Sequence, residues 1–162
     1  AGEEFTPLPS PYTRERYHKY LEMGADIVVG HHPHVPMNYE TVGDKIIFYS
    51  LGNFISSQTT PPRNASIILH LTVEQVADEA PNVTEVSFVP IWTQFRNSAD
   101  ENHFVVRSVT ERLSLSQAEK DAQIRKKDQK RLEEIHHETA SFLLDREIPL
   151  SEMQVEYTFP KP

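Results

Sequence analysis

The chain has 162 residues, which is enough for one domain with its own hydrophobic core. It contains no cysteine, so disulfides and thiolate metal sites are excluded, and no run of residues predicts a membrane-spanning helix. The formal net charge of -8 argues against a nucleic-acid partner, because phosphate binding needs clustered lysine and arginine.

The first predicted elements are a helix and a buried strand. Ser10 can cap a helix that has Pro11 at its first position and ends at Gly24. Residues 25–29 form a short apolar, β-branched run bounded by glycines, which predicts a strand. The order helix, strand and polar loop predicts an α/β arrangement with the loop at the carboxyl end of the strand.

A cluster of histidines follows this strand directly, at positions His31, His32 and His34. Neutral imidazole is the commonest protein ligand for zinc and other late transition metals. Pro33 fixes one backbone angle and would hold the rings of His32 and His34 in a fixed relation. The pattern therefore indicates a metal site. The alternative is a polar loop whose histidines cap neighbouring carbonyl groups.

The middle of the chain predicts further strands, because apolar and polar residues alternate there. A hairpin around Gly43-Asp44 comes first, and longer antiparallel strands of a second sheet follow it. The predicted strands are 37–42, 45–49, 66–73, 84–91 and 104–109.

The last third of the chain predicts a long charged helix. Ser116 begins a capping-box pattern, and one helix is expected to run from there to about Leu144. Its first half, 120–131, is almost wholly charged and has Ile124 as its only large apolar residue. Basic residues in this half could form a phosphate or lipid-headgroup patch. They alternate with acids, which favours a solvated helix face.

Two segments resemble the CapA and PgsA family of bacterial capsule synthesis proteins, within the calcineurin-like metallophosphoesterase superfamily. They are 24–35, read as GADIVVGHHPHV, and 45–54, read as KIIFYSLGNF. The opening stretch 2–5 is also similar to the family's Gly-x-Glu-Tyr, with Phe5 in place of tyrosine. The resemblance covers the first 55 residues strongly and the sheet up to about Trp92 loosely.

The resemblance implies an α/β (α+β) fold class. Residues 1–110 would be the C-terminal part of a two-sheet α/β sandwich of metallophosphoesterase type. Residues 111–162 would be a helical C-terminal extension built on the long helix.

The resemblance also implies a site. In the superfamily's Gly-His-x-His motif both histidines coordinate a two-metal centre, which assigns His32 and His34 as ligands here. His31 could replace His32 if the loop bulges. Glu4 aligns with the family's acid and would lie near the metals, whereas without the resemblance it would be a solvent-exposed residue. Asn53, in the loop 50–63, could hydrogen-bond near the site, although asparagine after glycine is also ordinary turn chemistry. The cofactors would be two divalent ions (manganese, iron or zinc), and no catalytic residue is assigned.

The family's other ligands lie on the N-terminal side of this region. By resemblance the chain would be inactive alone, with the N-terminal part of the same domain as its first partner. The implied function is metal-assisted hydrolysis during synthesis of capsule or poly-γ-glutamate, outside the cytoplasm at the bacterial cell surface. The alternative is a non-enzymatic scaffold or polymer-binding subunit of a membrane synthase complex.

Overall fold

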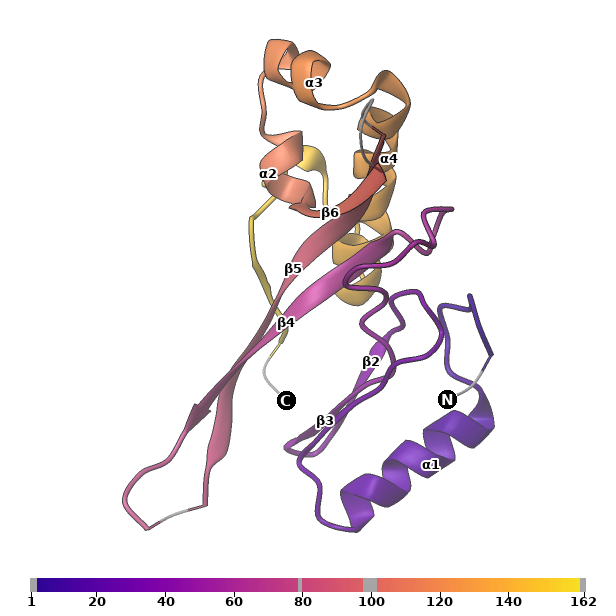
Figure 1. The fold of residues 1–162 in the computed structure, drawn as a ribbon. Coiled ribbons are helices and arrows are strands. Elements are labelled where there is room, and N and C mark those ends of the chain that lie inside the picture. Colours follow the sequence, from indigo (N-terminus) through magenta and orange to yellow (C-terminus); the bar gives the residue numbers. More distant parts are fainter. Residues whose placement is uncertain (1–2, 79, 98–101, 161–162) are drawn as a thin grey trace.

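The computed structural model describes residues 3–78, 80–97 and 102–160. Two β-sheets lie against each other, and most of the helices gather at one end of the second sheet (Figure 1). In chain order the elements are α1 (Pro11–Glu22), β1 (Ile27–Val29), β2 (Tyr39–Val42), β3 (Lys45–Phe48), β4 (Ala65–Glu74), β5 (Asn82–Asn97), β6 (Asn102–Ser108), α2 (Val109–Leu113), α3 (Gln117–Gln123), α4 (Lys126–His136), the π-helix η1 (His137–Ser141), the 3-10 helix η2 (Leu150–Glu152) and β7 (Tyr157–Thr158).

The first sheet has the strand order β1-β3-β2. β1 runs parallel to β3, whereas β2 and β3 form an antiparallel hairpin. Val42 pairs with Lys45, so the turn consists of Gly43 and Asp44, as predicted. Because β1 and β3 are parallel neighbours, the loops that follow them leave the same edge of the sheet.

α1 covers one face of this first sheet. Ser10 caps the helix by accepting a hydrogen bond from the backbone N–H of Thr13, which confirms the predicted start. The buried ring of Tyr17 stacks on the ring of Tyr49 in the loop after β3, with 5.5 Å between centroids. Leu21 is buried beside them. The helix is therefore held by one apolar stripe against the sheet.

The second sheet has the order β4-β5-β6. β7 pairs with Ser87 and Phe88 of β5, on the edge of β5 opposite β4. All its pairings are antiparallel, as the alternating pattern predicted. β4 and β5 form a long hairpin whose tip extends away from the rest of the molecule (Figure 1).

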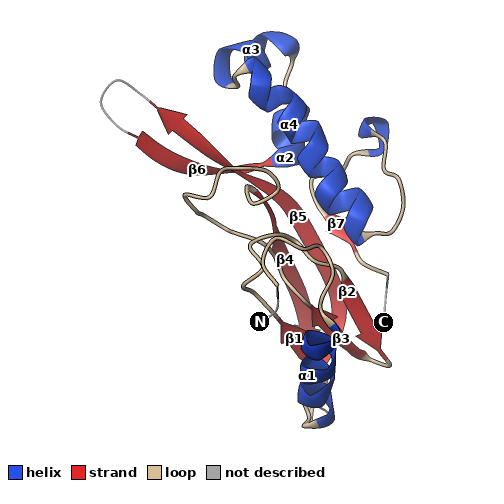
Figure 2. Cartoon of the chain, turned by 90° about the vertical axis from the view of Figure 1, so that its right-hand side faces the viewer, coloured by secondary structure: helices blue, strands red, loops and turns tan. Residues whose placement is uncertain are grey.

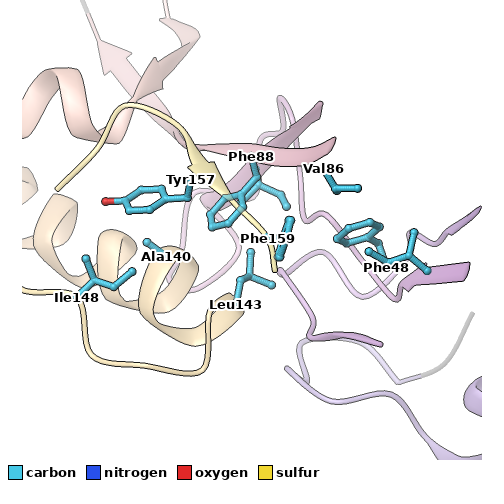
Figure 3. Packing of buried hydrophobic residues seen from close by; sticks show 10 residues of the cluster. Phe48, Val86, Phe88, Ala140, Leu143, Ile148, Tyr157 and Phe159 are labelled. Carbon is cyan, nitrogen blue, oxygen red and sulfur yellow. The ribbon is translucent and has the colours of Figure 1, made fainter. Parts of the chain in front are cut away.

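The main core lies between the two sheets and the C-terminal segment (Figure 3). Phe159 from the tail packs against Phe48 of β3 at 5.3 Å and against Phe88 of β5 at 4.8 Å. Leu143 and Tyr157 close the same cluster from the side of the helix and tail. The fold is thus a mixed α/β structure with two sheets, consistent with the predicted α+β sandwich.

The prediction of one helix from Ser116 to about Leu144 is wrong in its first part. The capping box at Ser116 forms as predicted, but α3 ends at Gln123 and Ile124 is extended, with φ -131° and ψ 124°. Ile124 is 4% exposed and packs with Trp92 and other apolar residues. The charged segment thus turns at Ile124, because a straight helix would not bury its one large apolar side chain at this place.

After this break, α4 and η1 form a continuous helical segment that lies beside β5 (Figure 2). Within the ranges that the structure describes, no helix combines the length and the apolar character needed to cross a membrane. The division of the chain at residue 110 stays a prediction.

Candidate metal site at the histidine loop

The histidine loop begins at Gly30, where the backbone passes through a space too small for any side chain. The N–H of Gly30 donates to the carbonyl oxygen of Phe48 at 2.7 Å, which extends the pairing of β1 with β3. A Cβ at this position would lie 2.4 Å from Tyr17 Oη and 2.5 Å from the carbonyl oxygen of Tyr49. Glycine is therefore required here by close packing.

The next residues adopt uncommon backbone angles. His32 has φ 109° and His34 has φ 64°, both in the left-handed region that residues with a side chain seldom occupy. Between them, buried Pro33 accepts a hydrogen bond at 2.9 Å from the N–H of Phe5. Backbone strain of this kind costs about 1–3 kcal/mol per residue and clusters at functional sites.

The side chain of His34 is oriented by Asn53, from the loop after β3. His34 Nδ1 lies 2.9 Å from Asn53 Oδ1. The amide nitrogen of Asn53 donates to the carbonyl oxygen of Arg63 at 3.1 Å, so the opposite amide orientation would place two oxygens against each other. Asn53 Oδ1 can only accept, and Nδ1 of His34 therefore carries the proton. This leaves the lone pair on Nε2.

That tautomer fits a metal ligand. Histidines that bind metals almost always donate the other ring N–H to an oxygen acceptor, which fixes the ring and increases its basicity. Asn53 is the acceptor that the sequence alone did not identify for His34. The structure thus brings together two of the predicted site residues, His34 and Asn53.

Two residues that sequence reasoning did not assign to the site also hold His34. The Phe5 ring stacks on the His34 ring, with 5.9 Å between centroids and 29° between planes. The guanidinium carbon of Arg63 lies 4.7 Å from the centroid of Phe5. Arg63 thus acts twice, through its carbonyl on Asn53 and through its side chain on Phe5. The family resemblance includes Phe5, which stands at the position of the family's tyrosine. No pattern in the sequence pointed to Arg63.

The other predicted site residues lie on the surface. His31 and His32 are exposed, and the His32 and His34 ring centroids are 6.2 Å apart at an angle of 46°. Glu4 lies on the exposed turn that precedes Phe5. Over the described part of the chain, no three histidine, cysteine or acidic side chains gather closely enough to hold a metal ion. Among the predicted site residues, the structure therefore orients His34 through a side-chain hydrogen bond to Asn53.

Comparison with known proteins places this loop in a family. Residues 1–58 match the family described as bacterial capsule synthesis protein. The chain is 36% identical over 141 residues to the capsule biosynthesis protein CapA of Bacillus anthracis, an alignment that covers 84% of the chain and 32% of that relative. It is 40% identical over 68 residues to the PGA biosynthesis protein CapA of Bacillus subtilis (strain 168), covering 41% of the chain and 18% of that relative.

The chain therefore belongs to the CapA-like family of capsule synthesis proteins, as the resemblance predicted. The alignments cover 32% of the length of the Bacillus anthracis relative and 18% of the length of the Bacillus subtilis relative, so the chain spans about a third of these proteins or less.

Proposed function

We propose that the histidine loop is one part of a divalent-metal site in a protein that makes or attaches an anionic surface polymer, capsule or poly-γ-glutamate, outside the cytoplasm. The observation that carries the proposal is the hydrogen bond between His34 Nδ1 and Asn53 Oδ1, because it directs a free Nε2 lone pair away from the acceptor. The relatives' names, capsule biosynthesis and PGA biosynthesis, support the polymer.

His34 and His32 would hold the metal. His31 would replace His32 as a ligand if the loop bulges. The remaining ligands would come from the N-terminal part of the same domain, outside this chain. When bound, a pair of divalent ions supplies an activated water and neutralises charge on a phosphoryl oxygen. Within this chain, Asn53 fixes the tautomer of His34 and Phe5 covers one face of its ring.

Hydrolysis of a phosphate ester is the reaction that this arrangement supports best. The test is cleavage of bis(p-nitrophenyl) phosphate and of p-nitrophenyl phosphate by the intact protein that carries this chain, with manganese, iron or zinc added. His34→Ala should lower the rate by more than about 10–100-fold, which is the usual loss when a residue that only supports a metal ligand is removed. His70→Ala is the matched control, because His70 is exposed on β4 and pairs with Glu156.

The outcomes separate the two functional classes. Hydrolysis that depends on His34 supports the enzyme. A protein that retains metal but cleaves neither ester contradicts the catalytic proposal and favours a non-enzymatic scaffold or polymer-binding subunit of a synthase complex.

A further inference from the structure

A second concave site lies between α4, β5 and the loop 59–64. It is a pocket of about 350 Å³, and we call it the basic pocket. Four cationic side chains line it, and they come from one short segment of the chain: Arg125, Lys127, Lys130 and Arg131. The period of α4 places positions 127, 130 and 131 on one side of the helix, which explains why residues that alternate with acids in the sequence meet here.

The charge of the basic pocket is opposite to that of the whole chain. Its lining has four cations against the two carboxylates of Asp128 and Glu134, an excess of two positive charges. The whole chain has a formal net charge of -8. An anionic ligand would therefore meet a local excess of positive charge here, in contrast to the net negative charge of the whole chain.

The two arginines build the walls of the pocket. Arg131 is 7% exposed, donates to Asn64 Oδ1 at 3.0 Å and forms an ion pair with Glu138 at 2.6 Å. Arg125 pairs with Asp128 at 2.6 Å. These guanidinium groups are already satisfied, so they fix the shape of the pocket.

The two lysines are available to a ligand. The side chain of Lys130 is 83% exposed, and its ammonium lies 3.6 Å from Glu134, a weak surface contact. Lys127 is exposed and has no ion pair among the residues that the structure describes. Trp92 and Phe95 of β5 supply apolar lining beside them. The combination suits a ligand that carries separated negative charges on an apolar backbone.

We propose that the basic pocket binds carboxylates of an acidic polymer chain, in which methylene groups separate the charges. This inference rests on the proposed function, because it assigns part of the polymer to a site next to the histidine loop. Asn64 lines the basic pocket, and the preceding residue, Arg63, accepts the hydrogen bond that orients Asn53. The loop 59–64 therefore contacts a residue of the histidine site and also lines the basic pocket.

The test is the affinity of the intact protein for a fluorescently labelled γ-linked oligoglutamate, measured by anisotropy at low salt. Lys127→Gln with Lys130→Gln should weaken binding about fivefold or more, since two exposed charges contact the ligand. Lys120→Gln with Lys126→Gln is the matched control: it removes the same charge from the same region, but neither lysine lines the basic pocket. We expect the control to change the affinity less than about twofold.

Equal losses in the two double variants, or no binding by the wild type, would overturn the proposal. Inorganic polyphosphate tests the other source of anionic charge: it would overturn the carboxylate assignment if it displaced the probe at lower concentration than unlabelled oligoglutamate does. His34→Ala should leave oligoglutamate binding unchanged, so failure of the metal site and failure of the basic pocket give different results.

Discussion

His34 donates its Nδ1 proton to Asn53, which lies in a second loop, 19 residues further along the chain. The contact follows from the topology of the first sheet. β1 and β3 are parallel neighbours, so the loops after them leave the same sheet edge. One loop brings the histidines and the other brings the asparagine that orients one of them.

Removal of the Asn53 amide should change the tautomer of His34. In the wild-type protein above pH 7.5, long-range proton–nitrogen NMR correlations should show the proton on Nδ1. Asn53→Ala removes the acceptor, so His34 should shift towards a mixture with the Nε2–H form. Gln58→Ala is the control, because it removes only a 3.4 Å contact of the Asn53 amide nitrogen. A wild-type protein with the proton on Nε2 would contradict the assignment.

Gly30→Ala should destabilise the fold, because its Cβ would lie 2.5 Å from the backbone carbonyl oxygen of Tyr49. The backbone on either side of Tyr49 is held by hydrogen bonds from Gly30 N–H to Phe48 and from Met37 N–H to Ser50, so this carbonyl has little freedom to move. Overpacking of this kind costs about 1–3 kcal/mol or more. Gly43→Ala is the matched control, with φ 63° and no heavy atom within 4 Å, so it should cost only the strain of about 1 kcal/mol. Urea unfolding of both variants measures the difference. Equal losses would contradict the close packing described at Gly30.

Glu40 should make the stability of the protein depend on pH. Burial raises the pKa of its carboxyl, but the hydrogen bond from Tyr49 and the charges of Arg14 and His18 outweigh it and lower the pKa below 4.5. A lowered pKa in the folded state stabilises the protein above pH 4.5, and this stabilisation is lost as the pH falls through the folded-state value.

Glu40→Gln should therefore be less stable than the wild type at about pH 6, and the difference should shrink at about pH 3. Urea unfolding at both pH values measures it. Glu22→Gln, at an exposed position of the same helix that carries Arg14 and His18, should show no such trend. A difference that grows towards acid pH would contradict the sign of the effect.

Arg131→Ala should destabilise the contact between α4 and the loop 59–64. It leaves Asn64, which is 5% exposed, and Glu138 without their shared donor. The loss of one member of a buried polar network costs about 3 kcal/mol. Lys130→Ala, which removes an exposed side chain of the same helix, should change the free energy of unfolding by less than about 0.5 kcal/mol. A loss at position 131 as small as at 130 would contradict the role of Arg131.

Local signals in the sequence predicted the first part of the fold well. A Ser-Pro helix start, a two-residue turn and alternating strands depend on residues close together in the chain, so Ser10 and the Gly43-Asp44 turn were placed correctly. The break at Ile124 could not be predicted in this way. Its cause is a contact with Trp92, more than thirty residues away in the chain.

The same distinction applies to the candidate site. The histidine spacing marked the loop, and the position of Asn53 in the loop after the predicted hairpin made it a candidate neighbour of the site. The orientation of His34 depends on Arg63 and Phe5, which come from two other segments and show no common pattern in the sequence. Only the folded chain reveals that they meet.

The most direct test of the account is the metal content of the intact protein that carries this chain, measured by plasma mass spectrometry. Wild type and His70→Ala should retain the same near-stoichiometric manganese, iron or zinc, and His34→Ala should lose most of it. Equal metal content in all three proteins, or no metal in the wild type after reconstitution, would contradict the assignment of His34 as a ligand.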